Sequence, residues 1–210
     1  IKAKPSVTFA DNRVEAAAYG FLVVSAGRLA ARRNVVANVT LGFALIRAAD
    51  VAVDEHDHGE GGDGLLMIAG TTLHVADSRF GSLNGAAIAV TQVQGTIAIA
   101  GTTARDCART KSVRAVQELI NANGHQGPAV VVLRDVRDAS VRGCDFVQNG
   151  AAGAGPVLDI CAQVGDALQI ESCRFRRGVP QPVRGSAAVN ALALEDRTQG
   201  SDPRIQFVGN

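Results

Sequence analysis

A repeat of 22 residues is the feature of this chain that most restricts how it can fold. The repeated pattern is apolar, any, apolar, two polar or small residues, a small hydrogen-bonding residue, any, apolar, and Leu73–Phe80 is a clear copy. Copies start at positions 7, 29, 51, 73, 97, 139, 168 and 205, so the first three intervals are 22 residues and the later ones are 24, 42, 29 and 37. A constant period followed by longer intervals predicts a solenoid with one turn per copy and loops inserted in its later turns.

A glycine followed by a short apolar run alternates with this pattern, as in the runs that start at Gly20, Gly42 and Gly64. These runs are bounded by turn residues and rich in branched side chains, which is typical of strands. Because this half of the repeat is β-type, the sequence favours a parallel β-helix over a leucine-rich repeat. We predict an all-β fold, a right-handed parallel β-helix of about eight coils, forming one domain over residues 1–210 with successive coils about 4.8 Å apart.

The small hydrogen-bonding residue of each copy is predicted to form an internal ladder at a bend of the solenoid. Asn12 and Asn34 suit this position because asparagine tolerates left-handed backbone and its amide can bond along the stack. The same register predicts which residues face the core: Leu29, Ala31, Leu73, Val75, Phe80, Val141, Phe146, Leu168, Ile170 and Phe175.

The interval of 42 residues indicates a helical insertion at about residues 105–124. Ser112 is placed to cap a helix, and Gly124 follows its end. The apolar face of this helix would consist of Val113, Val116, Leu119 and Ile120. We interpret the insertion as a helix packed on the side of the solenoid; the alternative is a lid or a partner-docking element.

An acidic stretch with two histidines, Asp54–Gly64, stands out because the chain has only 4 histidines. Counting from Val51 puts His56 at the ladder position and His58 in the column of core residues, so we interpret the stretch as one polar coil with a glycine-rich turn and no bound metal. The alternative is a cation or catalytic site that uses His56, His58 and one of Asp54, Asp57 or Asp63. Zinc sites usually show a further ligand at a recognisable spacing, which this stretch lacks.

The periodic pattern resembles the pectate-lyase-like β-helix superfamily, over nearly the whole chain. The resemblance implies enzymes that act on acidic sugars, some with calcium as a cofactor, and these need clustered outward carboxylates with a base nearby. The candidates for such catalysis are Asp54, Asp57 and His74. However, the outward column through His74 has no acid, and the next column, with Arg32, Asp54, Arg142 and Glu171, alternates in sign as ion pairs do. No active-site motif of the superfamily is intact.

Composition excludes several classes of partner. The net charge of +1 gives no electrostatic reason to bind nucleic acid or an anionic membrane. No apolar run approaches the roughly 20 residues that span a bilayer. Aromatic residues make up 4% of the chain and tryptophan is absent, which weakens the case for carbohydrate recognition.

These observations favour a non-catalytic structural or interaction module of a larger surface, phage-like or secretion-type assembly, at an extracellular or cell-surface location. The alternative is a polysaccharide lyase, hydrolase or epimerase that acts on acidic sugars. Because the repeat begins by Val7 and the last copy stops at Asn210, we expect a protein partner, or further coils of a longer polypeptide, to cap the ends. The compartment and the oligomeric state are left open.

The chain has 4 cysteines, at positions 107, 144, 161 and 173, and none of them forms a CxxC pair. Cys144 and Cys173 occupy equivalent ladder positions in adjacent coils. We interpret them as small buried thiols, because buried cysteine behaves as a small hydrophobic residue. A disulfide between them requires that the two side chains face each other.

Overall fold

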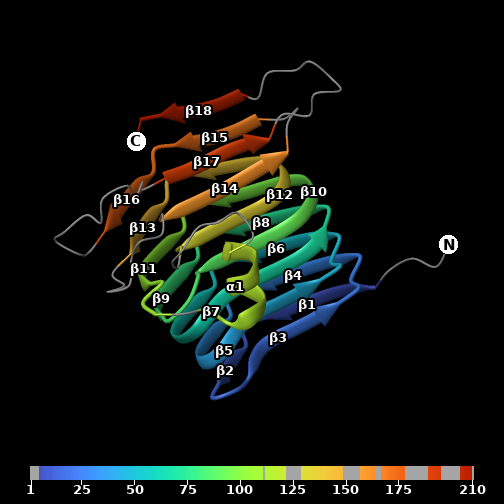
Figure 1. Cartoon of the computed structure of the whole chain (residues 1–210). Coiled ribbons are helices and arrows are strands. Elements are labelled where there is room, and N and C mark those ends of the chain that lie inside the picture. The colour runs from blue at the N-terminus through green and yellow to red at the C-terminus, as the bar shows by residue number, and fades with distance from the viewer. Residues whose placement is uncertain are drawn as a thin grey trace.

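The chain forms a parallel β-solenoid with three faces, in which strands far apart in sequence lie side by side (Figure 1). The computed structural model describes residues 5–110, 112–121, 129–148, 157–163, 167–177, 189–194 and 204–209. We call the segments that share one turn a level, and number levels from the N-terminus. All strand pairings between described residues of neighbouring levels are parallel.

Three columns of strands make the three faces. The first face stacks β1 (Ser6–Ala10), β4 (Arg28–Arg32), β6 (Asp50–Asp54), β8 (Thr72–Ala76), the ends of β10 (Ile88–Ala100) and β12 (Val131–Arg142), β15 (Ala167–Glu171) and β18 (Arg204–Val208). The second face stacks β2 (Arg13–Glu15), the beginnings of β5 (Val35–Ile46) and β7 (Asp57–Gly70), β9 (Arg79–Leu83), β11 (Thr103–Cys107), β13 (Asp145–Gln148) and β16 (Arg174–Arg177). The third face stacks β3 (Tyr19–Val24), the ends of β5 and β7, the beginnings of β10 and β12, β14 (Leu158–Gln163) and β17 (Val189–Leu194).

The register confirms the repeat that the sequence predicts. Every predicted start lies beside the next one on the first face: Val7, Leu29, Val51, Leu73, Ile97, Ala139, Leu168 and Ile205. The expected count of about eight coils therefore holds for this face. It is too high for the solenoid as a whole, which amounts to about five turns, because the later turns are interrupted by insertions.

Each turn bends at corners where one residue adopts left-handed backbone. At the corner between the first and second faces this residue has a positive φ at every level: Asp11, Arg33, Glu55, Asp77, Gly101, Gly143, Ser172 and Gly209. The expectation that Asn12 and Asn34 themselves would be left-handed is wrong, because the chain turns one residue earlier. The ladder residue can then point inward and bond along the stack.

The ladder itself is present. Asn12 Nδ2 donates to Asn34 Oδ1 at 2.9 Å, and Asn34 Nδ2 donates to the Phe9 carbonyl at 3.1 Å. In later levels the hydroxyls of Ser78 and Thr102 bond to carbonyls of their own corners, at 2.8 and 3.0 Å. Polar side chains are thus buried at this corner because each finds a partner there.

The core confirms the predicted inward residues. Nine of the ten are buried, from Val75 at 0% exposure to Leu168 at 4%, and Phe175 is partly buried against the same core. Inward glycines leave room for large side chains: a Cβ on Gly64 would lie 2.6 Å from Phe80 Cδ1. Aromatic rings pack inside the solenoid, with centroids 4.7 Å apart for Phe9 and Phe21 of the first level and 4.8 Å for Phe21 and Phe43 of successive levels.

The insertion contains one helix, α1 (Arg114–Asn121), shorter than the predicted 105–124 because β11 occupies the start of that range. It packs outside the third face (Figure 1). Val116 is buried there and Val113 partly buried, while the side chains of Leu119 and Ile120, and Gly124, lie outside the described residues. With eight residues, α1 is too short to cross a bilayer. No helix among the described residues is long and apolar enough to do so.

Candidate functional site

The solenoid distributes the stretch Asp54–Gly64 over different faces instead of gathering it into one site. Asp54 points outward on the first face and Asp57 is exposed on the second. His56 and His58 are inside the core, at 1% and 0% exposure. Asp63 is also buried, on the outer side of the third face, where it contacts the helical insertion. The described residues contain no group of three or more histidine, cysteine or acidic side chains that would hold a metal ion.

The catalytic candidates meet only in part. His74 Nε2 lies 3.9 Å from Asp54 Oδ1 on the outside of the first face, with half of the histidine side chain in water. Arg142 and Glu171 pair at 3.5 Å, as the alternating signs predict. Calcium takes six to eight oxygen ligands. The Asp54 carboxylate next to the His74 imidazole does not provide such a ligand set.

Other charged side chains pair between neighbouring levels at the corner. The Arg33 guanidinium bonds to Asp11 at 2.7 and 2.8 Å, and Arg32 lies 3.9 Å from Glu55. The pKa of Asp11 is lowered, mainly by its hydrogen bond to Arg33. Asp11 and Glu55 occupy the same corner position one level before and one level after Arg33, and the register alone does not decide which of them it binds.

The His56 ring is a neutral member of the core. Its Nδ1 lies 2.9 Å from the Asn34 carbonyl, so Nδ1 carries the proton and donates it. The ring packs edge-on against Phe43, with centroids 4.8 Å apart, and against Phe80 at 5.8 Å. Burial, with a smaller contribution from His58, lowers the pKa of His56 to about 3.

His58 is packed still more tightly. A Cβ on Gly42 would lie 2.6 Å from its Nδ1, so the ring rests directly on the glycine backbone. Neither ring nitrogen has a hydrogen-bond partner, and burial lowers the pKa of His58 to about 4. The ring centroids of His56 and His58 are 6.0 Å apart. Both rings are therefore neutral at pH 7 and closed off from solvent, which leaves them no access to a substrate.

Asp63 attaches the helical insertion to the solenoid. Its Oδ2 accepts the Val113 amide at 2.6 Å, at the start of α1, and its Oδ1 accepts the Ala86 amide at 2.7 Å. The expectation that Ser112 caps this helix is wrong: its hydroxyl lies 3.3 Å from the Ala86 amide, and Asp63, 50 residues away from Val113, satisfies the helix end. Burial raises the pKa of Asp63 to about 6.

Replacing Asp63 by alanine is expected to detach α1 and to lower the free energy of unfolding by about 2–3 kcal/mol. The Val113 amide loses its acceptor, and the Ala86 amide keeps only the longer contact with the Ser112 hydroxyl. Urea denaturation measures the loss, and faster hydrogen exchange of the Val113 and Gln117 amides locates it. The matched control is Asp57→Ala, which removes an exposed acid from the same strand and should cost less than about 0.5 kcal/mol. Equal losses in the two variants would contradict this role for Asp63.

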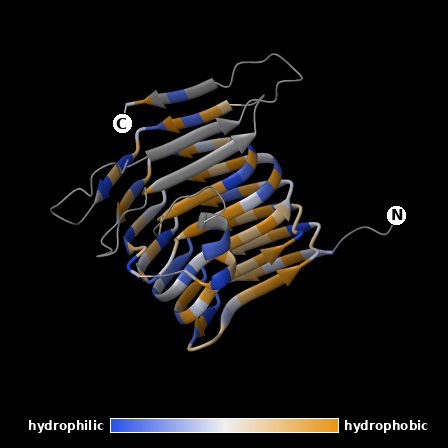
Figure 2. Ribbon diagram, in the orientation of Figure 1, coloured by the Kyte–Doolittle hydropathy of each residue, from blue (hydrophilic) through white to orange (hydrophobic). Residues whose placement is uncertain are grey.

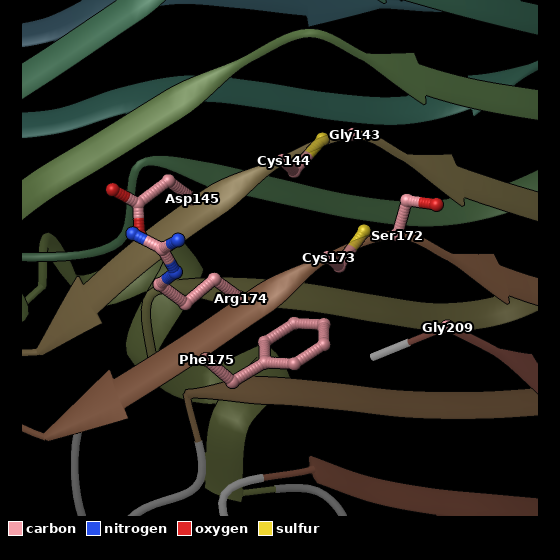
Figure 3. A pocket seen from close by; sticks show the side chains of 8 residues that line it. All are labelled: Gly143, Cys144, Asp145, Ser172, Cys173, Arg174, Phe175 and Gly209. Carbon is pink, nitrogen blue, oxygen red and sulfur yellow. The ribbon is translucent and has the colours of Figure 1, made fainter.

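A recess of about 730 Å³ lies at the corner between the first and second faces, near the C-terminal end of the solenoid (Figure 3). It is lined by Cys144 and Cys173 together with Asp145, Ser172, Arg174 and Phe175. Asp145 bonds to Arg105 at 3.0 Å and to Arg176 at 2.9 Å, and the pKa of its carboxyl is lowered by these two guanidiniums against the opposing effect of burial. One signal of this site is visible in the sequence, namely the two cysteines at equivalent ladder positions.

Comparisons of the chain with protein-family models, with curated proteins and with solved structures find no match. The parallel solenoid agrees with the β-helix that the resemblance implied. Membership of the pectate-lyase-like superfamily, and any activity that it implies, stays a hypothesis.

Proposed function

We propose that this chain is a non-catalytic β-solenoid module that works inside a larger assembly, where another β-structured segment stacks on its N-terminal level. The segment is a protein partner or a further coil. The observation that supports this most is the combination of an open strand edge and exposed apolar side chains on the first level.

The first level offers hydrogen-bonding groups to a new strand. Among the described residues β1 pairs only with β4, and β2 and β3 pair only with β5. Within the part of the chain that the structure describes, no strand pairs with their other edges, and open edges recruit strands. Inward residues of this level, Val7, Phe9 and Val14, are only partly buried. A further coil would both extend the ladder beyond Asn12 and cover these side chains.

The outer side of β3 is apolar as well. Tyr19, Leu22 and Val24 are 50%, 55% and 58% exposed, and β3 is mostly orange in Figure 2. At later levels the residues in register with Leu22 are covered: Leu66, Ala89 and Val132 are buried in the cluster beneath α1. The apolar stripe thus continues to the first level, where its side chains are exposed and not packed beneath α1. Such exposure is expected for a surface that meets a partner.

Light scattering on the isolated chain tests the proposal. We expect self-association that grows with protein concentration, since the open edges of two copies can substitute for the missing partner. The double variant Leu22→Lys/Val24→Lys should shift the equilibrium toward monomer by about tenfold or more, because charges block edge pairing. The control Ala52→Lys adds a charge to the outer side of the first face at a level that is paired on both sides, so it should leave the equilibrium unchanged. A wild-type chain that stays monomeric at all concentrations would contradict the proposal.

The alternative, an enzyme acting on acidic polysaccharides, has one observation in its favour. The Asp54–His74 pair lies on the first face, which also has a shallow recess of about 250 Å³ beside Asp138, Ser140 and Gln169. Cleavage of an acidic polysaccharide by the wild type that disappears in His74→Ala would favour this alternative.

A further inference from the structure

The ladder position changes its chemistry near the C-terminal end of the solenoid. Asparagine, histidine, serine and threonine occupy it in earlier levels, and Cys144 and Cys173 occupy it in two adjacent ones, immediately before the paired residues Asp145 and Arg174. Strands of neighbouring levels are about 4.8 Å apart, and a disulfide needs Cα atoms about 4.4–6.8 Å apart. The backbone therefore already holds the two cysteines at a separation that a disulfide can bridge.

The two thiols lie one above the other on adjacent levels. Neither cysteine is part of a disulfide, and both are buried, at 2% and 5% exposure. In Figure 3 both sulfur atoms lie on the same side of their strands, beside the recess. Cys144 Sγ lies 3.2 Å from the Arg142 carbonyl, and Cys173 Sγ lies 3.3 Å from the Glu171 carbonyl, so each side chain is held in one orientation.

The recess gives small molecules a route to this pair. The corner residues Gly143 and Ser172 are exposed, as is Arg174, so the sulfur atoms lie just beneath the surface. Cys107 offers a contrast within the same chain. Its thiol is fully buried against the Phe80 carbonyl, and burial raises its pKa to about 12.

We propose that Cys144 and Cys173 are a redox-active dithiol, which closes to a disulfide between adjacent levels by exchange with a low-molecular-weight disulfide that enters the recess. The Cys173 thiolate attacks one sulfur of the small disulfide, whose S–S bond breaks and releases one thiolate that takes a proton. Cys144 then gives up its proton and attacks the Cys173 sulfur, which expels the second thiolate. Two protein thiols are oxidised by two electrons, and one small disulfide is reduced to two thiols.

The order of the two cysteines follows from their exposure and acidity, and Cys173 is the more exposed, at 5% against 2% for Cys144. The hydrogen bond from Cys144, aided by backbone amides, lowers the pKa of Cys173 to about 7, whereas the same bond and burial raise the pKa of Cys144. Because the thiolate is the nucleophile, Cys173 attacks first and Cys144 resolves the mixed disulfide.

The test uses the full reduced chain with glutathione disulfide as the probe, followed by intact-mass analysis and peptide mapping. We expect a mass lower by about 2 Da, from the loss of two hydrogens, with the cross-link mapped to Cys144 and Cys173 and with Cys107 still a thiol. Cys144→Ser should stop at a mixed disulfide on Cys173. Cys173→Ser should react at least about tenfold more slowly, because the remaining thiol is mostly protonated.

Both variants place a serine at a position that Ser78 already fills in an earlier level, so they should keep the fold; circular dichroism checks this, and Cys107→Ser is the matched control. The proposal is overturned by any of three results: native thiols that resist the probe while the unfolded chain reacts, a wild type that stops at the mixed disulfide, or a cross-link that involves another cysteine.

Discussion

Replacing Phe80 by alanine is expected to lower the free energy of unfolding by about 3–5 kcal/mol, the usual cost of emptying a large aromatic site in a core. Phe80 is 2% exposed and lies against the rings of His56 and His58, with centroids 5.8 and 6.4 Å away. The space cannot collapse easily, because stacked strands on every face fix the surrounding backbone. Urea denaturation followed by circular dichroism measures the loss.

Phe175→Ala is the matched comparison for this prediction. Phe175 occupies the same column of the second face but is only partly buried and lines the recess, so its removal exposes less new apolar surface. We expect a clearly smaller loss than for Phe80. A loss below about 1 kcal/mol for Phe80→Ala would show that the inward register of the solenoid is wrong.

The period of the sequence was sufficient to predict the stacking, because parallel strands in register require the same residue type at the same place in each turn. Leu29 lies beside Val51, and Val51 beside Leu73, as the 22-residue interval requires. The same reasoning put His56 and His58 inside the solenoid, where the structure has them. One-dimensional periodicity thus predicts which side of a strand a residue faces.

Contacts between different parts of a turn were beyond this reasoning. Asp63 caps a helix that begins 50 residues later, and Ser112, the nearest capping residue in sequence, does not take that role. Arg33 reaches Asp11 and not Glu55 because side-chain length and corner geometry decide the pairing. The recess at Cys144 and Cys173 likewise depends on where the corner opens to solvent, which no periodic pattern records.

Acid is expected to destabilise the protein through His56 and His58. Their folded pKa values of about 3 and 4 lie below the ordinary 6.5, so the unfolded chain binds protons more readily than the folded one. The stability that comes from keeping both rings neutral is fully present above pH 6.5 and is lost as the pH falls toward 4. A pH of 4.5 is about two units below the unfolded pKa of each ring. Keeping both rings neutral at that pH lowers the free energy of unfolding by roughly 5 kcal/mol in total.

Asp63 acts in the opposite direction over the same range. Its folded pKa of about 6 lies above the ordinary 3.8, so the folded state gains a proton first and is stabilised as the pH falls from 6 toward 4. The wild-type profile therefore reports the sum of these opposing effects. Isolating the histidines requires a variant that removes them and keeps Asp63.

The double variant His56→Asn/His58→Val provides this comparison, because it copies Asn34 and Val36 from the same columns one level earlier. Urea denaturation between pH 7 and 4.5 should show a loss of stability that is smaller by roughly 5 kcal/mol than in the wild type. His74→Ala, which removes an exposed imidazole, controls for the loss of a histidine as such. If the double variant and the wild type lose stability in parallel as the pH falls, the two rings are not held neutral in the core, and the solenoid must admit water or another proton acceptor beside them.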